Sequence, residues 1–142
     1  MSSEPLFRQR FDICGRDYTN GGRASIAIKG ILREIGIHPS VIRRVAIASY
    51  EAEMNVVLYA HKGAMELKVT PKDIRITVED EGPGIPDVEL AMQEGYSTAS
   101  DEIREMGFGA GMGLPNIKKN ADTLAVDSVL GKGTTVDIMI RL

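Results

Sequence analysis

Two polar side chains four residues apart, Glu51 and Asn55, are the first candidates for chemistry in this sequence. Residues with this spacing share one face of a helix. A carboxylate can orient or deprotonate a nucleophile, and an amide oxygen suits Mg²⁺, which prefers oxygen ligands. On its own the pair is more typical of an exposed helix surface. Glu53 falls about 200° around the helix from Glu51 at roughly 100° per residue, so we expect Glu53→Gln to do little to binding or chemistry at such a site.

The stretch Asp80-Glu-Gly-Pro-Gly-Ile-Pro86 is the second candidate. The alternation of Ile74, Ile76 and Val78 with polar residues predicts a strand that ends there, with Asp80 at its tip. The glycines permit a close approach that larger residues forbid. A carboxylate in this position could accept a hydrogen bond from an amino group such as that of adenine. The same residues also make a good turn with no further role.

A third segment has glycines at four alternate positions, Gly107, Gly109, Gly111 and Gly113, ahead of a predicted helix. Successive backbone N–H groups at a helix N-terminus bind phosphate well. The spacing matches neither the dinucleotide-binding fingerprint nor a Walker motif. The signature motifs of eukaryotic protein kinases are absent from the sequence, which excludes that class. A phosphate cradle and a merely flexible loop both remain open.

Taken in order, the three segments resemble the N, G1 and G2 boxes of the GHKL ATP-binding superfamily, over about residues 40–140. This superfamily includes gyrase, heat-shock chaperone ATPases, mismatch-repair ATPases and histidine kinases. The resemblance implies that Glu51 is the catalytic base, that Asn55 is a Mg²⁺ ligand and that Asp80 binds adenine. It implies that Thr134 supports the adenine end. The full nucleotide-binding set implied is Asn55, Asp80, Gly82, Gly84, Ile85, Gly109, Gly111, Gly113, Leu114 and Thr134.

Within the superfamily, the chain is similar to the small serine/threonine kinases of bacterial partner switches, the anti-sigma factor and stressosome-type switch kinases. The similarity lies in Tyr50–Ala60, Glu79–Asp87, Gly95–Thr98 and Gly111–Pro115. It implies an ATP- and Mg²⁺-dependent kinase that phosphorylates a STAS-domain protein, with a sigma factor or another regulator as a further partner. Two alternatives stay open: an anti-sigma factor that acts mainly by nucleotide-dependent sequestration, and a detached histidine-kinase catalytic domain.

The region between the second and third boxes is expected to form an ATP lid at about residues 94–110. We expect it to be mobile without nucleotide and more ordered with it. The segment at residues 99–106 is longer and more acidic than expected for the shortest switch kinases. Residues 79–94 contain six carboxylates and no Lys or Arg, so an anionic nucleotide bound close by would need Mg²⁺ to offset the charge. Lys118 and Lys119 could add positive charge, although an exposed helix surface is the more typical explanation.

The elements that must position these residues follow from hydrophobic periodicity. The sequence predicts a strand at 6–13, a helix that Asp17 or Thr19 caps and that ends near Ile35, and a second helix at about 40–60. Strands at 64–69 and 73–79, a short helix at 87–92, a helix at 113–120 and strands at 124–129 and 134–140 follow. This order predicts an α+β two-layer sandwich, with helices on one face of a mixed, mostly antiparallel sheet.

Composition fits one domain spanning residues 1–142, since 43% of residues are hydrophobic and 26% charged. Apolar runs are too short to cross a bilayer, the start lacks signal-peptide character, and Cys14 is the single cysteine. We therefore expect a cytoplasmic protein that does not bind a membrane. The net charge of −3 argues against nucleic acid as a partner. The first 45 residues nevertheless carry eight basic and four acidic side chains, which suits a charged solvated face or a protein docking surface. A homodimer stays open.

Overall fold

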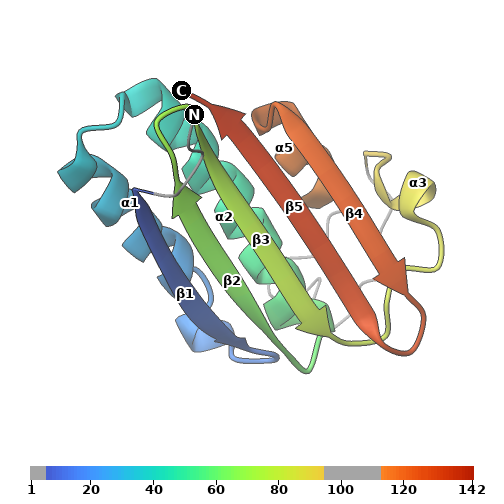
Figure 1. The fold of residues 1–142 in the computed structure, drawn as a ribbon. Helices are drawn as coiled ribbons and strands as arrows, with labels where there is room; N and C mark the ends of the chain where they lie inside the picture. The colour runs from blue at the N-terminus through green and yellow to red at the C-terminus, as the bar shows by residue number, and fades with distance from the viewer. Residues whose placement is uncertain (1–5, 95–112) are drawn as a thin grey trace.

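The computed structural model describes residues 6–94 and 113–142 (Figure 1). Its strands are β1 (Phe7–Cys14), β2 (Lys62–Val69), β3 (Asp73–Glu81), β4 (Thr123–Val129) and β5 (Gly133–Arg141). Its helical elements are the 3₁₀ turn η1 (Tyr18–Asn20), then α1 (Arg23–Ile35), α2 (Pro39–Tyr59), α3 (Val88–Ala91) and α5 (Gly113–Asn120). Every predicted strand and helix is present, and only the start of α1 departs clearly from its predicted position.

The strands form one sheet in the order β1-β2-β3-β5-β4. Each pair of neighbouring strands in the described residues is antiparallel, so the expectation of a mixed sheet is replaced by an antiparallel one. β3 lies between β2 and β5, in the middle of the sheet (Figure 1). The end of β3, where Asp80 lies, therefore has a neighbouring strand on either side.

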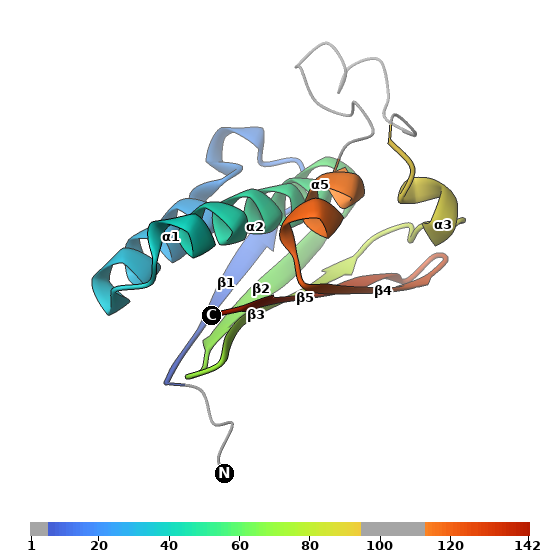
Figure 2. The ribbon, with the colours of Figure 1, turned by 90° about the horizontal axis from the view of Figure 1, so that it is seen from above.

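Three helices, α1, α2 and α5, cover one face of this sheet, and Figure 2 shows them on the same side. On β3 the alternation places Ile74, Ile76 and Val78 on the buried face. α2 supplies Val45 and Val56, both fully buried, to the other side of the core. The predicted α+β two-layer sandwich is confirmed. In the parts of the chain that the structure describes, no helix is long and apolar enough to span a membrane.

The start of α1 differs from the prediction, because neither Asp17 nor Thr19 caps it. α1 begins at Arg23 behind Gly22, which takes a left-handed conformation with φ of 96° and contributes no side-chain cap. The carboxylate of Glu53, on α2, instead accepts hydrogen bonds from three backbone N–H groups, those of Gly22, Ala24 and Ser25, at 2.9–3.1 Å. Glu53 is only 3% exposed. Glu53, which the sequence singled out only as a control for binding and chemistry, is thus a buried cap between two helices.

We predict that Glu53→Gln lowers the free energy of unfolding by about 1.5–3 kcal/mol, the range for hydrogen bonds to a charged group. The substitution removes the charge that faces the N-terminus of α1 and brings an amide donor close to backbone donors. Urea unfolding followed by circular dichroism measures the change. Glu34→Gln, on an exposed position of α1, is the matched control and should leave stability unaltered. Equal midpoints for Glu53→Gln and wild type would contradict the capping role.

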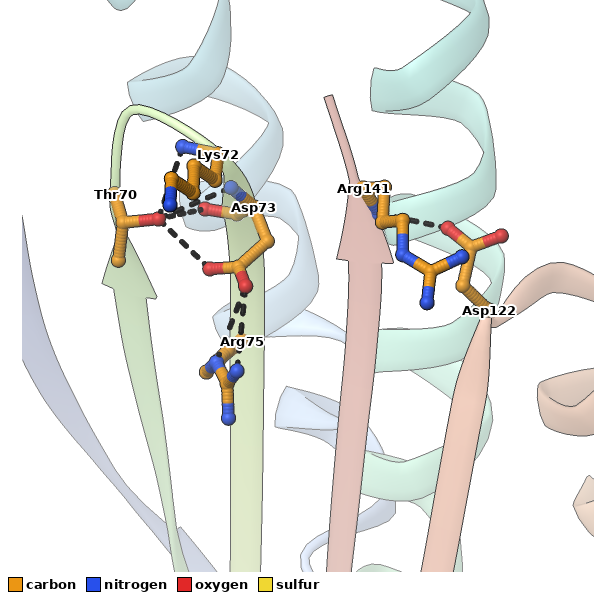
Figure 3. A network of polar contacts seen from close by, with 6 residues as sticks. All are labelled: Thr70, Lys72, Asp73, Arg75, Asp122 and Arg141. Atoms are coloured by element: carbon orange, nitrogen blue, oxygen red, sulfur yellow. Dashed lines mark hydrogen bonds and ion pairs between the residues drawn. The ribbon is translucent and has the colours of Figure 1, made fainter. Parts of the chain in front are cut away.

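Polar contacts close the end of the sheet that lies away from Asp80 (Figure 3). The hydroxyl of Thr70 accepts the backbone N–H groups of Lys72 and Asp73 and donates to the Asp73 carboxylate at 2.8 Å. These bonds close the turn between β2 and β3. The Arg141 backbone N–H donates to the Asp122 carboxylate at 2.7 Å, and this bond lowers the pKa of Asp122. These contacts are structural, and the residues expected to carry chemistry lie at the opposite end.

Candidate functional site

Asp80 continues the inward face of β3 beyond Val78 and is half-buried at the strand end. Its Oδ1 atom accepts the backbone N–H of Thr134, on β5, at 3.1 Å. Burial raises the pKa of Asp80, and the Thr134 hydrogen bond opposes this shift. The neighbouring carboxylates Glu79 and Glu81 are exposed, as the alternation of the strand predicts. Asp80 is therefore the one carboxylate of this run that faces the helical layer.

Three glycines near the end of β3 lie where backbone segments pass very close to one another. A Cβ on Gly133 would lie 1.9 Å from the backbone oxygen of Asp80. A Cβ on Gly82 would lie 3.0 Å from Cα of Ala60, and one on Gly84 would lie 2.6 Å from the backbone oxygen of Val129. Gly84 also has a φ of 78°, which side-chain-bearing residues rarely adopt. These glycines let the loop after β3 fold tightly against α2 and against the turn between β4 and β5.

Ser128, at the end of β4, joins that loop to β5. Its hydroxyl accepts the backbone N–H of Ile85 at 2.7 Å and lies 2.9 Å from the hydroxyl of Thr134. Ser128 is not among the residues that the sequence motifs predicted. The alternation of β4 contains the signal, because Ser128 follows Leu124 and Val126 on the inward face of the strand. Thr134 and Ile85, both predicted site residues, are thereby held together beside Asp80.

The second half of the site lies between α2 and α5. The side chain of Asn116, on α5, donates from Nδ2 to Oε2 of Glu51, on α2, at 2.9 Å. Asn55 lies one turn further along α2, and a Cβ on Gly113 would lie only 3.1 Å from its Oδ1 atom. The start of α5 thus reaches the Asn55 amide. Glu51 and Asn55 are both half-buried, so the plain exposed-surface interpretation of the pair is wrong.

Gly63 connects the two halves. It is the register partner of Asp80 on β2. A Cβ on Gly63 would lie 2.9 Å from Cγ1 of Val56 and 3.3 Å from Cβ of Asp80. Val56 directly follows Asn55 in α2. Gly63 therefore lets Asp80 pack close to Val56, the residue of α2 that follows the predicted metal ligand Asn55.

The remaining predicted residues divide into three groups. The side chain of Leu114 is 6% exposed and belongs to the core, which leaves its backbone for any contact with a ligand. Lys118 and Lys119 are exposed, and Lys119 pairs with Glu94 at 2.6 Å, in agreement with a helix surface. Gly109, Gly111 and most of the predicted lid lie outside the described residues.

These features fit a nucleotide. The described side chains alone do not form a complete metal site. The inward-facing Asp80 carboxylate can accept a hydrogen bond, the glycines allow the loop to pack closely beside it, and the first N–H groups of α5 lie beside the Asn55 amide oxygen. Among residues 6–94 and 113–142, no three His, Cys, Asp or Glu side chains gather as a metal site. A Mg²⁺ ion at Asn55 would accordingly take most of its oxygen ligands from phosphate and water.

The fold and the site together define an ATP-binding domain of the GHKL type. The family model described as "Histidine kinase-, DNA gyrase B-, and HSP90-like ATPase" matches residues 41–142, and the chain belongs to this family. It is 33% identical over 112 residues to the serine/threonine-protein kinase RsbT of Bacillus subtilis, covering 76% of this chain and 78% of the relative. It is 38% identical over 100 residues to the anti-sigma F factor of Caldanaerobacter subterraneus, covering 67% and 66%.

Two solved structures share the fold. The RsbU and RsbW domains of Rv1364c from Mycobacterium tuberculosis superpose with a TM-score of 0.62 at 17% identity, over 94% of this chain and 32% of that larger chain. The SiaB–SiaC complex from Pseudomonas aeruginosa gives a TM-score of 0.64 at 13% identity, over 97% and 90%. At these identities the likeness concerns the fold. The resemblance to partner-switch kinases and anti-sigma factors that the sequence predicted is confirmed.

Proposed function

We propose that this chain is an ATP- and Mg²⁺-dependent protein serine/threonine kinase that phosphorylates a STAS-domain protein in a partner-switching pathway. One observation carries the proposal. Glu51 is half-buried and held by Asn116 through Oε2, and its Oε1 accepts no hydrogen bond from the described residues. A carboxylate held through one oxygen is suited to orient a hydroxyl group through the other and to take its proton.

Each site residue then has a separate role. Asp80 accepts a hydrogen bond from the adenine amino group, and Thr134 holds the Asp80 carboxylate in place through its backbone N–H. The first N–H groups of α5 face the phosphates. Asn55 contributes an oxygen to Mg²⁺, which neutralises phosphate charge when bound. Glu51 takes the proton of the attacking Ser or Thr hydroxyl. The whole of residues 1–142 would act as one kinase domain.

The relatives support protein phosphorylation over simple ATP hydrolysis. One of them is a serine/threonine-protein kinase that this chain matches over most of both lengths. Others are anti-sigma F factors, so sequestration of a sigma factor under control of nucleotide is the second candidate function. A detached histidine kinase would also use this fold. Phosphoserine and phosphothreonine survive acid whereas phosphohistidine does not, so the chemistry of the product separates the kinase alternatives.

We predict that Asn55→Ala impairs nucleotide binding and phosphoryl transfer together and weakens the dependence of binding on Mg²⁺. The reason is that the substitution removes an oxygen ligand of the metal. Calorimetric titration of ATP with and without Mg²⁺ measures the effect. In wild type, removal of Mg²⁺ should weaken binding strongly, and in Asn55→Ala the difference should shrink. An undiminished Mg²⁺ effect in the variant would show that Asn55 is not a ligand.

Incubation of the protein with γ-labelled ATP, Mg²⁺ and purified STAS-domain proteins of the same organism tests the proposed function. Label should appear on a STAS-domain protein with wild-type kinase and be lost with Glu51→Gln. Tight binding to a STAS-domain protein or a sigma factor without any transfer of label would favour sequestration.

A further inference from the structure

A groove of about 590 Å³ runs between α1 and the first half of α2, on the helical layer. Three basic side chains line it, Lys29 and Arg33 from α1 and Arg43 from α2. Apolar side chains form the rest, including Ile37, Ile42 and Ile47. Figure 2 shows α1 and α2 side by side on the outer surface of the molecule. The groove lies apart from the end of α2 that carries Glu51 and Asn55.

We propose that this groove is a docking site for an acidic, amphipathic helix of a protein partner. The inference goes beyond the proposed function, because the groove shares no residue with the nucleotide site. Any partner segment that fills it must match two features, an apolar floor and a rim of one charge.

The charge of the groove rim determines which charge a partner segment must carry. No acidic residue is among those that line the groove. In the described residues, none of Lys29, Arg33 and Arg43 lies within ion-pair distance of a carboxylate. Lys29 and Arg33 are four residues apart on α1, where like charges repel and destabilise a helix. A partner carboxylate would relieve this repulsion, so electrostatic complementarity selects an acidic segment.

The apolar part of the surface indicates a helix as the occupant. Ile47, which lines the groove, is 38% exposed. Outside the groove lining, Tyr50 on α2 is 38% exposed and Ile26 on α1 is 71% exposed. Large apolar side chains that remain exposed together mark interaction surfaces. The stretch from Pro39 to Ile47 covers about 12 Å along α2 at roughly 1.5 Å per residue. That length accommodates about two turns of an amphipathic helix laid between two helices, a recurring mode of recognition.

A charge-swap experiment with two synthetic helical peptides tests the proposal. Both carry Leu at helical spacing, and the flanking positions are Glu in one and Lys in the other. Fluorescence anisotropy with the full-length protein and Mg-ATP should show binding of the Glu peptide alone. Arg33→Glu and Arg43→Glu should each weaken that binding about tenfold, and the double variant should bind the Lys peptide instead. Arg10→Glu, on the bare sheet face, is the control and should change nothing.

Several results would overturn the docking proposal. They are equal affinity for the two peptides, no binding of either at millimolar concentration, or affinities that the groove variants leave unaltered. Binding of phosphatidylglycerol vesicles through the same residues, without binding of the Glu peptide, would assign the groove to a membrane surface. Self-association that Arg33→Glu abolishes, again without peptide binding, would assign it to a second copy of the chain. ATP affinity and phosphoryl transfer, measured on the same variants, report separately on the proposed kinase function.

Discussion

Asp80→Asn is expected to weaken ATP binding about 10- to 100-fold, which corresponds to the loss of one charge-assisted hydrogen bond worth roughly 1.5–3 kcal/mol. The asparagine oxygen can still accept the backbone N–H of Thr134, so the local geometry is preserved. Isothermal titration calorimetry measures the affinity. Asp127→Asn, at an exposed position of β4, is the matched control and should bind ATP as wild type does.

The same substitution should not harm the fold. Because burial raises the pKa of Asp80, the folded state favours the protonated carboxyl. The stabilisation from this group is present below the unfolded value of 3.8 and is lost as the pH rises through the folded pKa. At pH 7 the asparagine removes a buried charge, so the free energy of unfolding should stay equal or increase.

An ATP analogue without the 6-amino group tests the assigned contact directly. Purine riboside triphosphate should bind wild type weakly and should lose little further affinity with Asp80→Asn, because both changes remove the same hydrogen bond. Unchanged ATP affinity in Asp80→Asn, or additive losses for analogue and variant, would remove Asp80 from the adenine contact.

Glu51→Gln is expected to leave ATP affinity near normal and to cut phosphoryl transfer by ~10²–10⁴, the usual range for a positioned general base. Glutamine keeps the shape and an oxygen that can accept the Asn116 amide at the position of Oε2. It removes the charge that attracts the hydroxyl proton. Single-turnover transfer to a confirmed STAS-domain target measures the loss.

Glu53→Gln is not a suitable control for the Glu51→Gln experiment. Glu53 caps α1, so a change there would confound activity with stability. Glu34→Gln, on the exposed surface of α1, should transfer phosphate at the wild-type rate. A wild-type rate for Glu51→Gln itself would show that the general-base assignment is wrong.

Local patterns predicted the fold and the placement of single residues well. The period-2 alternation of β3 places Ile74 and Val78 inward, and the same count places Asp80 inward at the tip. The sequence predicted a helix from about residue 40, and the structure has Pro39 at the first position of α2 with the His38 ring accepting the Ser40 backbone N–H. These features depend on residues close in sequence.

Contacts between distant segments could not be predicted in the same way. The role of Glu53 depends on how α1 packs across α2, some 30 residues away in the chain. Asn116 follows the last glycine of the third segment, yet only the packing of α5 on α2 brings it to Glu51. Helical periodicity correctly places Glu51 and Glu53 on different faces of α2. It does not predict which neighbouring helix each face contacts.

Acid treatment of the labelled product tests the kinase assignment most directly. After reaction of the protein with γ-labelled ATP, Mg²⁺ and a STAS-domain protein, the label should remain on that protein in hot acid. Phosphoamino acid analysis should then place it on Ser or Thr, and Glu51→Gln should abolish it. Label that acid releases as phosphate would point to phosphohistidine. The absence of label on every STAS-domain protein that the chain binds tightly would contradict the central claim and leave sequestration as the function.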